Sequence, residues 1–344
     1  MNTDLKNAWE NLKKEMPKLR IRDAAKHLNV SEAELLATKL GPSVKLLKPD
    51  WADFLLNTTE LGYVMALTRN ESCVHERKGI YKDISVNGQT ALAVGEDIDL
   101  RIFLNDWKYG FYAEEPKEND VMRSFQFFDS KGEAVHKIYQ TDKSSTAGWE
   151  KIKTLFVDET QVFTTPTKTS KPKTETNDSK EIPQFLEAWS KLEDTHDFFS
   201  LLRKFKYSRE FSLQAASGKF TFKISTEDFL NLMQESSKRE LDIMIFVGNP
   251  GMIQIHTGKI QRLEPMGPWF NVLDPEFNLH LRTDKIESVW VVDKPTRDGL
   301  VTSVEVFDNE GELILQMFGK RKPGIPQSSI WFQLTREYLN PSLV

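Results

Sequence analysis

The chain has 344 residues, of which 39% are hydrophobic and 11% aromatic, enough to bury the cores of two domains. A formal net charge of -5 excludes a global electrostatic attraction to nucleic acid or an anionic membrane, so any anion site must be a local basic pocket. Cys73 is the single cysteine, which excludes a disulfide framework and a thiolate metal cluster. No apolar run is long enough for a transmembrane helix or a signal peptide, so the expected location is the cytoplasm.

Residues 3–40 predict a group of helices. Ser31 followed by Glu34 is the pattern of a capping box at the start of one of them. The stretch IRDAAKHLNVSEAELLA also has the order of a helix-turn-helix, which leaves DNA binding as an alternative. Its second helix is acidic and apolar around Leu36, where a groove-reading helix needs Arg, Lys, Asn or Gln, so a structural cap is the better interpretation.

Residues 63–136 alternate between apolar and polar side chains with a period of two, which predicts antiparallel strands. Asn87-Gly88 and residues 130–132 are typical of hairpin turns between them. The following segment, TTPTKTSKPKTETNDSKEIP, is poor in apolar residues and rich in Thr, Lys and Pro, so it cannot form a core. We expect a linker over residues 164–184.

The sequence after the linker repeats the sequence before it. Ala8-Trp9 recurs as Ala188-Trp189, an offset of 180 residues, and FFDSKGEAVHKIY aligns with VFDNEGELILQMF so that Gly132 matches Gly311, an offset of 179. Several matches in order at nearly constant offset indicate an internal duplication. The predicted fold is α+β, with a helix-plus-large-antiparallel-sheet unit over 1–163 and again over 185–344.

A candidate ligand-binding stretch runs from Leu186 to Arg209, with the sequence LEAWSKLEDTHDFFSLLRKFKYSR. Its apolar residues, including Phe199, recur at helical spacing, and Asp194 or Thr195 can cap a helix that carries His196 in its first turn. An imidazole beside aromatic rings, with cationic residues next in the sequence, suits a flat apolar ligand that carries acidic groups at one edge. The alternative is an ordinary solvated or core histidine.

The two halves differ in charge at equivalent positions. His196 lies opposite Met16, Lys294 opposite Glu115 and Arg321 opposite Asp142. Surface drift would explain each difference alone, but together they favour one anion-accepting site served mainly by the second half. The basic turn FGKRKPG, which contains Arg321, supports the same interpretation.

The repeat, the opening LKNAWENLKKEMPKLRIRDAAKHLNVSEAELLA, the segment DLRIFLNDWKYGF and the ending FGKRKPGIPQ resemble the haemin-degrading factor family of bacterial cytoplasmic haem-utilisation proteins, the HemS/ChuS/HmuS type. The resemblance covers essentially the whole chain. It implies two stacked repeats and one haem bound in a cleft between the halves.

The resemblance also implies roles for individual residues. The axial ligand of the haem iron falls on His196, and a distal arginine that stabilises negative charge as oxygen is reduced falls on Arg101. From the residues alone, the alternative for Arg101 is a structural ion pair with Asp97 or Asp99. The remaining contacts to haem comprise two aromatic residues and the cations that hold the propionates, namely Phe103, Phe246, Arg209, Lys294 and Arg321.

Two functions remain open at this stage. In the first, the protein is a haem oxygenase-like oxidoreductase that opens the haem ring and releases iron for iron acquisition, with an external reductant or reductase as partner. In the second, it is a carrier that takes haem from an inner-membrane importer and passes it to an accepting protein. Both need the same iron ligand and propionate contacts, so the sequence does not separate them.

Overall fold

The structure is a computed structural model of the chain. It describes residues 3–117, 120–166, 177–322 and 324–339. Residues 167–176 of the expected linker lie outside this range. Helix α6 begins at Ile182, within the segment expected to be linker.

The chain divides into two compact units. The first comprises residues 1–69, 76–170 and 248–254, and the second comprises residues 70–75, 171–247 and 255–344. The helices of the first unit are α1 (Thr3–Glu15), α2 (Ile21–His27), α3 (Glu32–Ala37), α4 (Trp51–Asn57) and α5 (Thr146–Phe156). Those of the second are α6 (Ile182–Ser190), α7 (Asp197–Phe205), α8 (Arg209–Ala215), α9 (Thr226–Lys238) and α10 (Ser329–Glu337).

The described strands belong to two antiparallel sheets of nine strands each. The first nine strands are β1 (Val44–Leu46), β2 (Gly62–Arg69), β3 (Cys73–Gly79), β4 (Ile84–Asn87), β5 (Thr90–Val94), β6 (Asp99–Phe103), β7 (Tyr109–Lys117), β8 (Asp120–Phe128) and β9 (Ala134–Ser144). The others are β10 (Thr221–Ile224), β11 (Ile243–Asn249), β12 (Met252–Gly258), β13 (Leu263–Met266), β14 (Trp269–Leu273), β15 (Phe277–Arg282), β16 (Ser288–Thr296), β17 (Gly299–Phe307) and β18 (Leu313–Gly319).

Strand order confirms the internal duplication. Five strands of the first unit follow the order β1-β7-β8-β9-β2, and the second unit repeats it as β10-β16-β17-β18-β11. Strands β7 and β8 begin 179 residues before β16 and β17, the offset predicted from the sequence. Gly132 and Gly311, which the sequence aligned, both have positive φ, at 79° and 74°, in matching hairpin turns where glycine adopts this conformation without strain. The α+β fold of two equivalent units is therefore confirmed.

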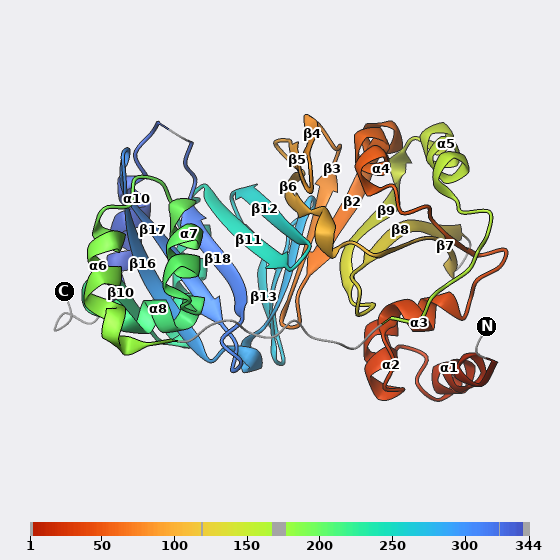
Figure 1. The fold of residues 1–344 in the computed structure, drawn as a ribbon, viewed down its shortest axis with the longest axis horizontal. Coiled ribbons are helices and arrows are strands. Elements are labelled where there is room, and N and C mark those ends of the chain that lie inside the picture. The colour runs from red at the N-terminus through yellow and green to blue at the C-terminus, as the bar shows by residue number, and fades with distance from the viewer. Residues whose placement is uncertain (1–2, 118–119, 167–176, 323, 340–344) are drawn as a thin grey trace. The chain divides into compact units, whose positions relative to one another are not determined.

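Helices cover both faces of the sheet within each unit. In the first unit α4 and α5 pack on the face that carries Phe125 and Phe127, and α3 packs on the other face against Phe128. In the second unit α9 and α10 pack on the Val304 face, whereas α6, α7 and α8 gather on the face of β16 and β17 that carries Trp290 (Figure 1). The sheet face covered by α6, α7 and α8 also carries Lys294, one of the residues predicted to bind a ligand.

The N-terminal helices form a structural cap. Ser31 and Glu34 form the predicted capping box at the start of α3. Leu36 is 1% exposed, and most of α3 is buried against the sheet. A helix buried in this way cannot enter a DNA groove, so the helix-turn-helix interpretation is wrong. None of the described helices is long and apolar enough to cross a membrane.

Candidate functional site

His196 lies at the N-terminal end of α7, as the N-cap residue itself rather than in the first turn as the sequence suggested. The backbone N–H of His196 donates to Oδ1 of Asp194 at 2.8 Å, so the aspartate closes the turn before the helix. Phe198, Leu201 and Leu202 form the buried face of the helix. Phe199, expected on that face, is 61% exposed, because the helix begins later than the sequence pattern suggested.

The imidazole of His196 is held at one nitrogen and open at the other. Its Nδ1 lies 2.6 Å from Oδ1 of Asp194, and its side chain is 88% exposed. A neutral imidazole that donates from Nδ1 to a carboxylate leaves the Nε2 lone pair available to a metal. The backbone N–H and ring of His196, together with the nearby Arg321, hold the pKa of Asp194 below its usual range, which keeps this carboxylate ionised.

Two of the three cations expected to bind propionates lie around one buried carboxylate. Arg209, at the start of α8, donates from Nε and Nη2 to the two oxygens of Glu305 at 2.6 and 2.8 Å. Lys294 on β16 donates to the same carboxylate at 2.8 Å. Burial by itself would raise the pKa of Glu305, but Arg209 and Lys294 outweigh it and hold the pKa well below its usual range.

Phe198 connects this cluster to the end of α7. The Lys294 ammonium lies 4.7 Å and the Arg209 guanidinium 5.3 Å from the centroid of the Phe198 ring. Phe198 follows His196 by two residues, so the candidate iron ligand and the cations stand on adjoining parts of the second unit. Arg321 lies close enough to Asp194 for its charge to help lower the pKa of that carboxylate.

Phe246 lies on β11, on the face that carries Glu305 and the other cluster residues. Its ring centroid is 5.1 Å from that of Phe318, and its strand partner is Gln316, which donates to Glu305. Phe246 and Phe318 are partly exposed. This part of the sheet therefore presents aromatic surface next to a cationic cluster, which is the combination that a porphyrin with carboxylate side chains requires.

Arg101 and Phe103 belong to the first unit, on β6, where their side chains share one face as predicted. Arg101 forms an ion pair with Asp99 through Nη1 and also donates to the carbonyl of Leu100 at 3.2 Å. The structural pairing considered from the sequence is thus present, and Asp99 is its partner. The neighbouring strand β5 places Leu92, which is partly exposed, opposite Arg101.

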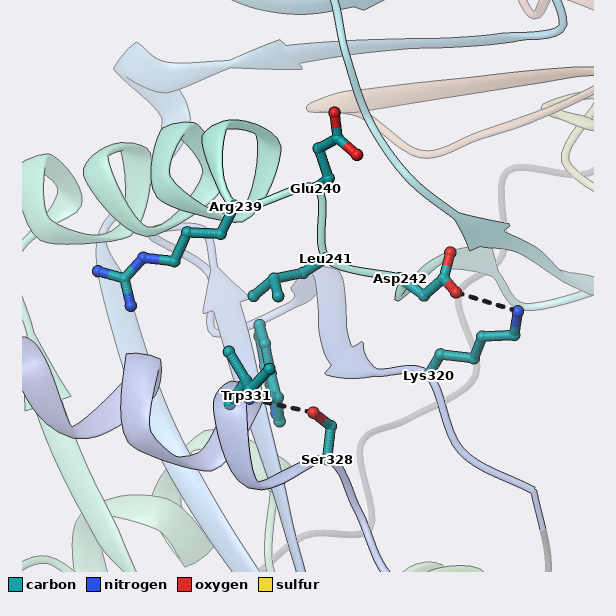
Figure 2. Close-up of a pocket in the computed structure, with 8 residues that line it drawn as sticks. Arg239, Glu240, Leu241, Asp242, Lys320, Ser328 and Trp331 are labelled. Carbon is teal, nitrogen blue, oxygen red and sulfur yellow. Dashed lines mark hydrogen bonds and ion pairs between the residues drawn. The ribbon is translucent and has the colours of Figure 1, made fainter.

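Lys320 and Arg321, neighbours in the basic turn after β18, act on different carboxylates. Lys320 forms an ion pair with Asp242 at 3.3 Å, on the wall of a hollow of about 390 Å³ where α9 ends and α10 begins. Figure 2 shows Lys320 turned toward Asp242, with Arg239 and Trp331 on other parts of the wall. Arg239, on the same wall, is paired with Glu337 at 2.7 Å.

The second unit thus brings together five of the predicted site residues, namely His196, Arg209, Phe246, Lys294 and Arg321, while Arg101 and Phe103 lie in the first unit. Sequence reasoning missed Glu305, the residue that organises two of the cations. A signal was available in the duplication, because position 305 lies 179 residues after Gln126 and is a further charge difference between the halves.

Comparison with known proteins extends these findings. The family model described as "Haemin-degrading HemS.ChuX domain" matches the chain twice, over residues 29–156 and 206–338, which agrees with the duplicated topology. The hemin transport protein HmuS of Yersinia pestis is 32% identical to the chain, over 100% of the chain and 99% of that protein.

Two kinds of solved structure share the whole fold. Holo-PhuS, a heme-binding protein from Pseudomonas aeruginosa, is 43% identical with a TM-score of 0.95, over 97% of this chain and 98% of that chain. The heme degrading enzyme ChuS of Escherichia coli O157:H7 is 29% identical with a TM-score of 0.92, over 98% of this chain and 99% of that chain. The chain therefore belongs to the HemS/ChuX family of haem-binding and haemin-degrading proteins, as its resemblance suggested.

Proposed function

We propose that this protein binds haem through its second unit and degrades it by oxidative ring opening, with release of iron for iron acquisition. The observation that carries the proposal is the state of His196, whose Nδ1 is held by Asp194 while its side chain is 88% exposed, two residues before the Phe198 ring that Lys294 and Arg209 contact. The family supports the chemistry, since ChuS is described as a heme oxygenase.

The residues present fit haem as the substrate. His196 would hold the haem iron through Nε2, and the carboxylate of Asp194 would strengthen that ligand by accepting a hydrogen bond from Nδ1–H. Arg209 and Arg321 offer permanently charged guanidinium groups to the propionates, and Lys294 adds a point charge. Phe246 supplies flat apolar contact. When bound, haem supplies the iron at which oxygen is reduced and the macrocycle that is opened.

Arg101 has the chemistry for a second role in this reaction. Its guanidinium is charged at every physiological pH and its side chain is 36% exposed, so it can stabilise negative charge that develops as oxygen is reduced. Phe103, two residues on, would restrict water on the same face. The electrons would come from an external reductant or a partner reductase, and the proposed location is the cytoplasm.

Haem transport is the second candidate function. The high exposure of His196 favours it, because an accessible ligand can be exchanged between proteins, and HmuS and HemS of two Yersinia species are named hemin transport proteins. A carrier would take haem from an inner-membrane importer and deliver it to an accepting protein. The buried α3 argues against a third role in DNA binding.

A titration with haemin followed by reduction separates the two functions. We expect a saturable one-to-one shift of the Soret band on binding. Ascorbate or a reductase in air, with catalase present to remove free peroxide, should then bleach the band and release iron. A stable Soret band under the same conditions would favour transport, and the absence of any shift on titration would contradict both.

A further inference from the structure

Glu305 is an unusual residue to find inside an anion site. Its side chain has no solvent exposure, and its carboxylate accepts hydrogen bonds from five donor atoms. These are Arg209 Nε, Arg209 Nη2, Lys294 Nζ, Ser303 Oγ and Gln316 Nε2, at 2.6 to 3.2 Å. A carboxylate saturated in this way is fixed in position, and it fixes the groups that donate to it.

Glu305 also sets the charge that the site presents. Arg209 and Lys294 contribute two positive charges and Glu305 one negative, which leaves a single net positive charge on the cluster. Arg321 and the ionised Asp194 that it acts on add one charge of each sign and leave this total unchanged. The Arg209–Lys294–Glu305 cluster thus keeps a positive charge that attracts a ligand carboxylate.

The geometry argues that a ligand does not displace Glu305. The Lys294 side chain is only 3% exposed, so a carboxylate arriving from solvent cannot reach its ammonium without opening the cluster. The Arg209 side chain is 24% exposed, and its Nη1 has no hydrogen-bond partner among the described residues. Nη1 is therefore the donor that remains available to a ligand while Arg209 stays bound to Glu305.

We propose that Glu305 is a positioning residue for ligand carboxylates: it holds Arg209 and Lys294 so that the outer edge of the Arg209 guanidinium meets a propionate. This inference rests on the proposed function and names the part of haem that the cluster recognises. Glu305 itself does not touch the ligand.

Removing the carboxylate should disorganise both cations. Without its bidentate partner the Arg209 guanidinium is free to turn toward solvent. Burial lowers the pKa of Lys294 and Glu305 opposes that shift, so Lys294 becomes easier to deprotonate once Glu305 is replaced. Both changes weaken the attraction of the site for carboxylates, but neither affects the iron ligand or the aromatic contacts.

The first unit provides a matched control. Glu32 is buried there between Lys137 and Arg69, also a cluster of one carboxylate and two cations. Glu32→Gln removes the same chemical group from the same kind of environment, but outside the second unit.

The test compares ferric protoporphyrin IX with its dimethyl ester, whose propionates are neutral, on the full chain. The wild type should prefer the diacid. Glu305→Gln should weaken diacid binding by about tenfold or more and change ester binding by less than about twofold, since charged hydrogen bonds are lost only for the diacid. Glu305→Asp, which keeps the carboxylate, should restore much of the preference, and Glu32→Gln should leave the preference unchanged.

Other outcomes overturn specific steps. Equal loss of both ligands in Glu305→Gln, despite a folded circular dichroism spectrum, would give Glu305 a structural role only. Tighter diacid binding in that variant would make Glu305 a competitor of the ligand. A wild type that binds both ligands equally would refute recognition of propionates while leaving haem binding intact, and a wild type that binds neither would refute the proposed function itself.

Discussion

Replacing Glu32 by Gln should strongly destabilise the first unit. Glu32 is 2% exposed and neutralises Lys137 and Arg69, whose side chains are 7% and 9% exposed. The variant leaves two cations buried without a carboxylate, a change that typically costs about 3–5 kcal/mol. With a urea dependence of about 3 kcal/mol per molar for a chain of this size, the midpoint of unfolding should fall by about 1 M or more.

The stability contributed by the Glu32 cluster should also depend on pH. Burial by itself would raise the pKa of Glu32, but Lys137 and Arg69 outweigh it and lower the pKa to about 2. Because the folded-state pKa lies below the unfolded value, the stabilisation is complete above the unfolded value of about 4.5 and is lost as the pH falls from there toward 2. Glu32→Gln should lack this part of the acid sensitivity.

Urea unfolding followed by tryptophan fluorescence and circular dichroism measures the effect. Glu115→Gln is the control, because Glu115 forms a partly exposed ion pair with Lys39 at 2.9 Å and such pairs contribute at most about 1 kcal/mol. If the two variants lowered the midpoint equally, or if Glu32→Gln had no effect, the assignment of Glu32 as a buried charged group would be refuted.

Three further predictions concern single side chains. His196→Ala should abolish the Soret shift of the wild type, whereas Met16→Ala at the equivalent position should not; equal loss from both would refute an asymmetric site. Arg321→Glu should speed the transfer of haem to apomyoglobin several-fold, with Lys322→Glu as a control on the same turn, and equal rates would place the propionates elsewhere. Burial lowers the pKa of His136 from 6.5 to about 3, so the unfolded chain takes up a proton at a higher pH than the folded chain does. As the pH falls from 6.5 toward 3, the free energy of unfolding should therefore decrease by up to about 1.4 kcal/mol per pH unit. His136→Gln should reduce the difference in stability between pH 7.5 and pH 5 measured by urea unfolding, and an unchanged difference would contradict this assignment.

Predictions of caps and turns were correct where the interacting residues lie within a few positions of each other in the chain. The capping box of Ser31 and Glu34 and the hairpin turns that contain Gly88 and Gly132 are set by side chains and dihedral angles close together in the chain, and they formed as predicted. The duplication was visible for a different reason, because two halves with one ancestor keep the spacing of their turns and strands.

The pattern was less informative about which way a helix faces. The helix around His196 was expected to start one or two residues earlier, with His196 inside it and Phe199 on its buried face. Phe198 and Phe199 are adjacent and equally apolar, so periodicity alone could not choose between them. Packing of Phe198 against Trp189, with ring centroids 4.5 Å apart, decided the helix orientation.

The sequence by itself determined that this is a duplicated α+β protein and pointed to His196, Arg209, Lys294 and Arg321 as a divergent, cationic set in the second half. Only the tertiary structure decided which carboxylate holds two of those cations, because Glu305 comes from a strand 96 residues after Arg209. The pairing of charges distant in the chain depends on strand register and on which face a helix covers. These are properties of the packed molecule, and no spacing in the sequence records them.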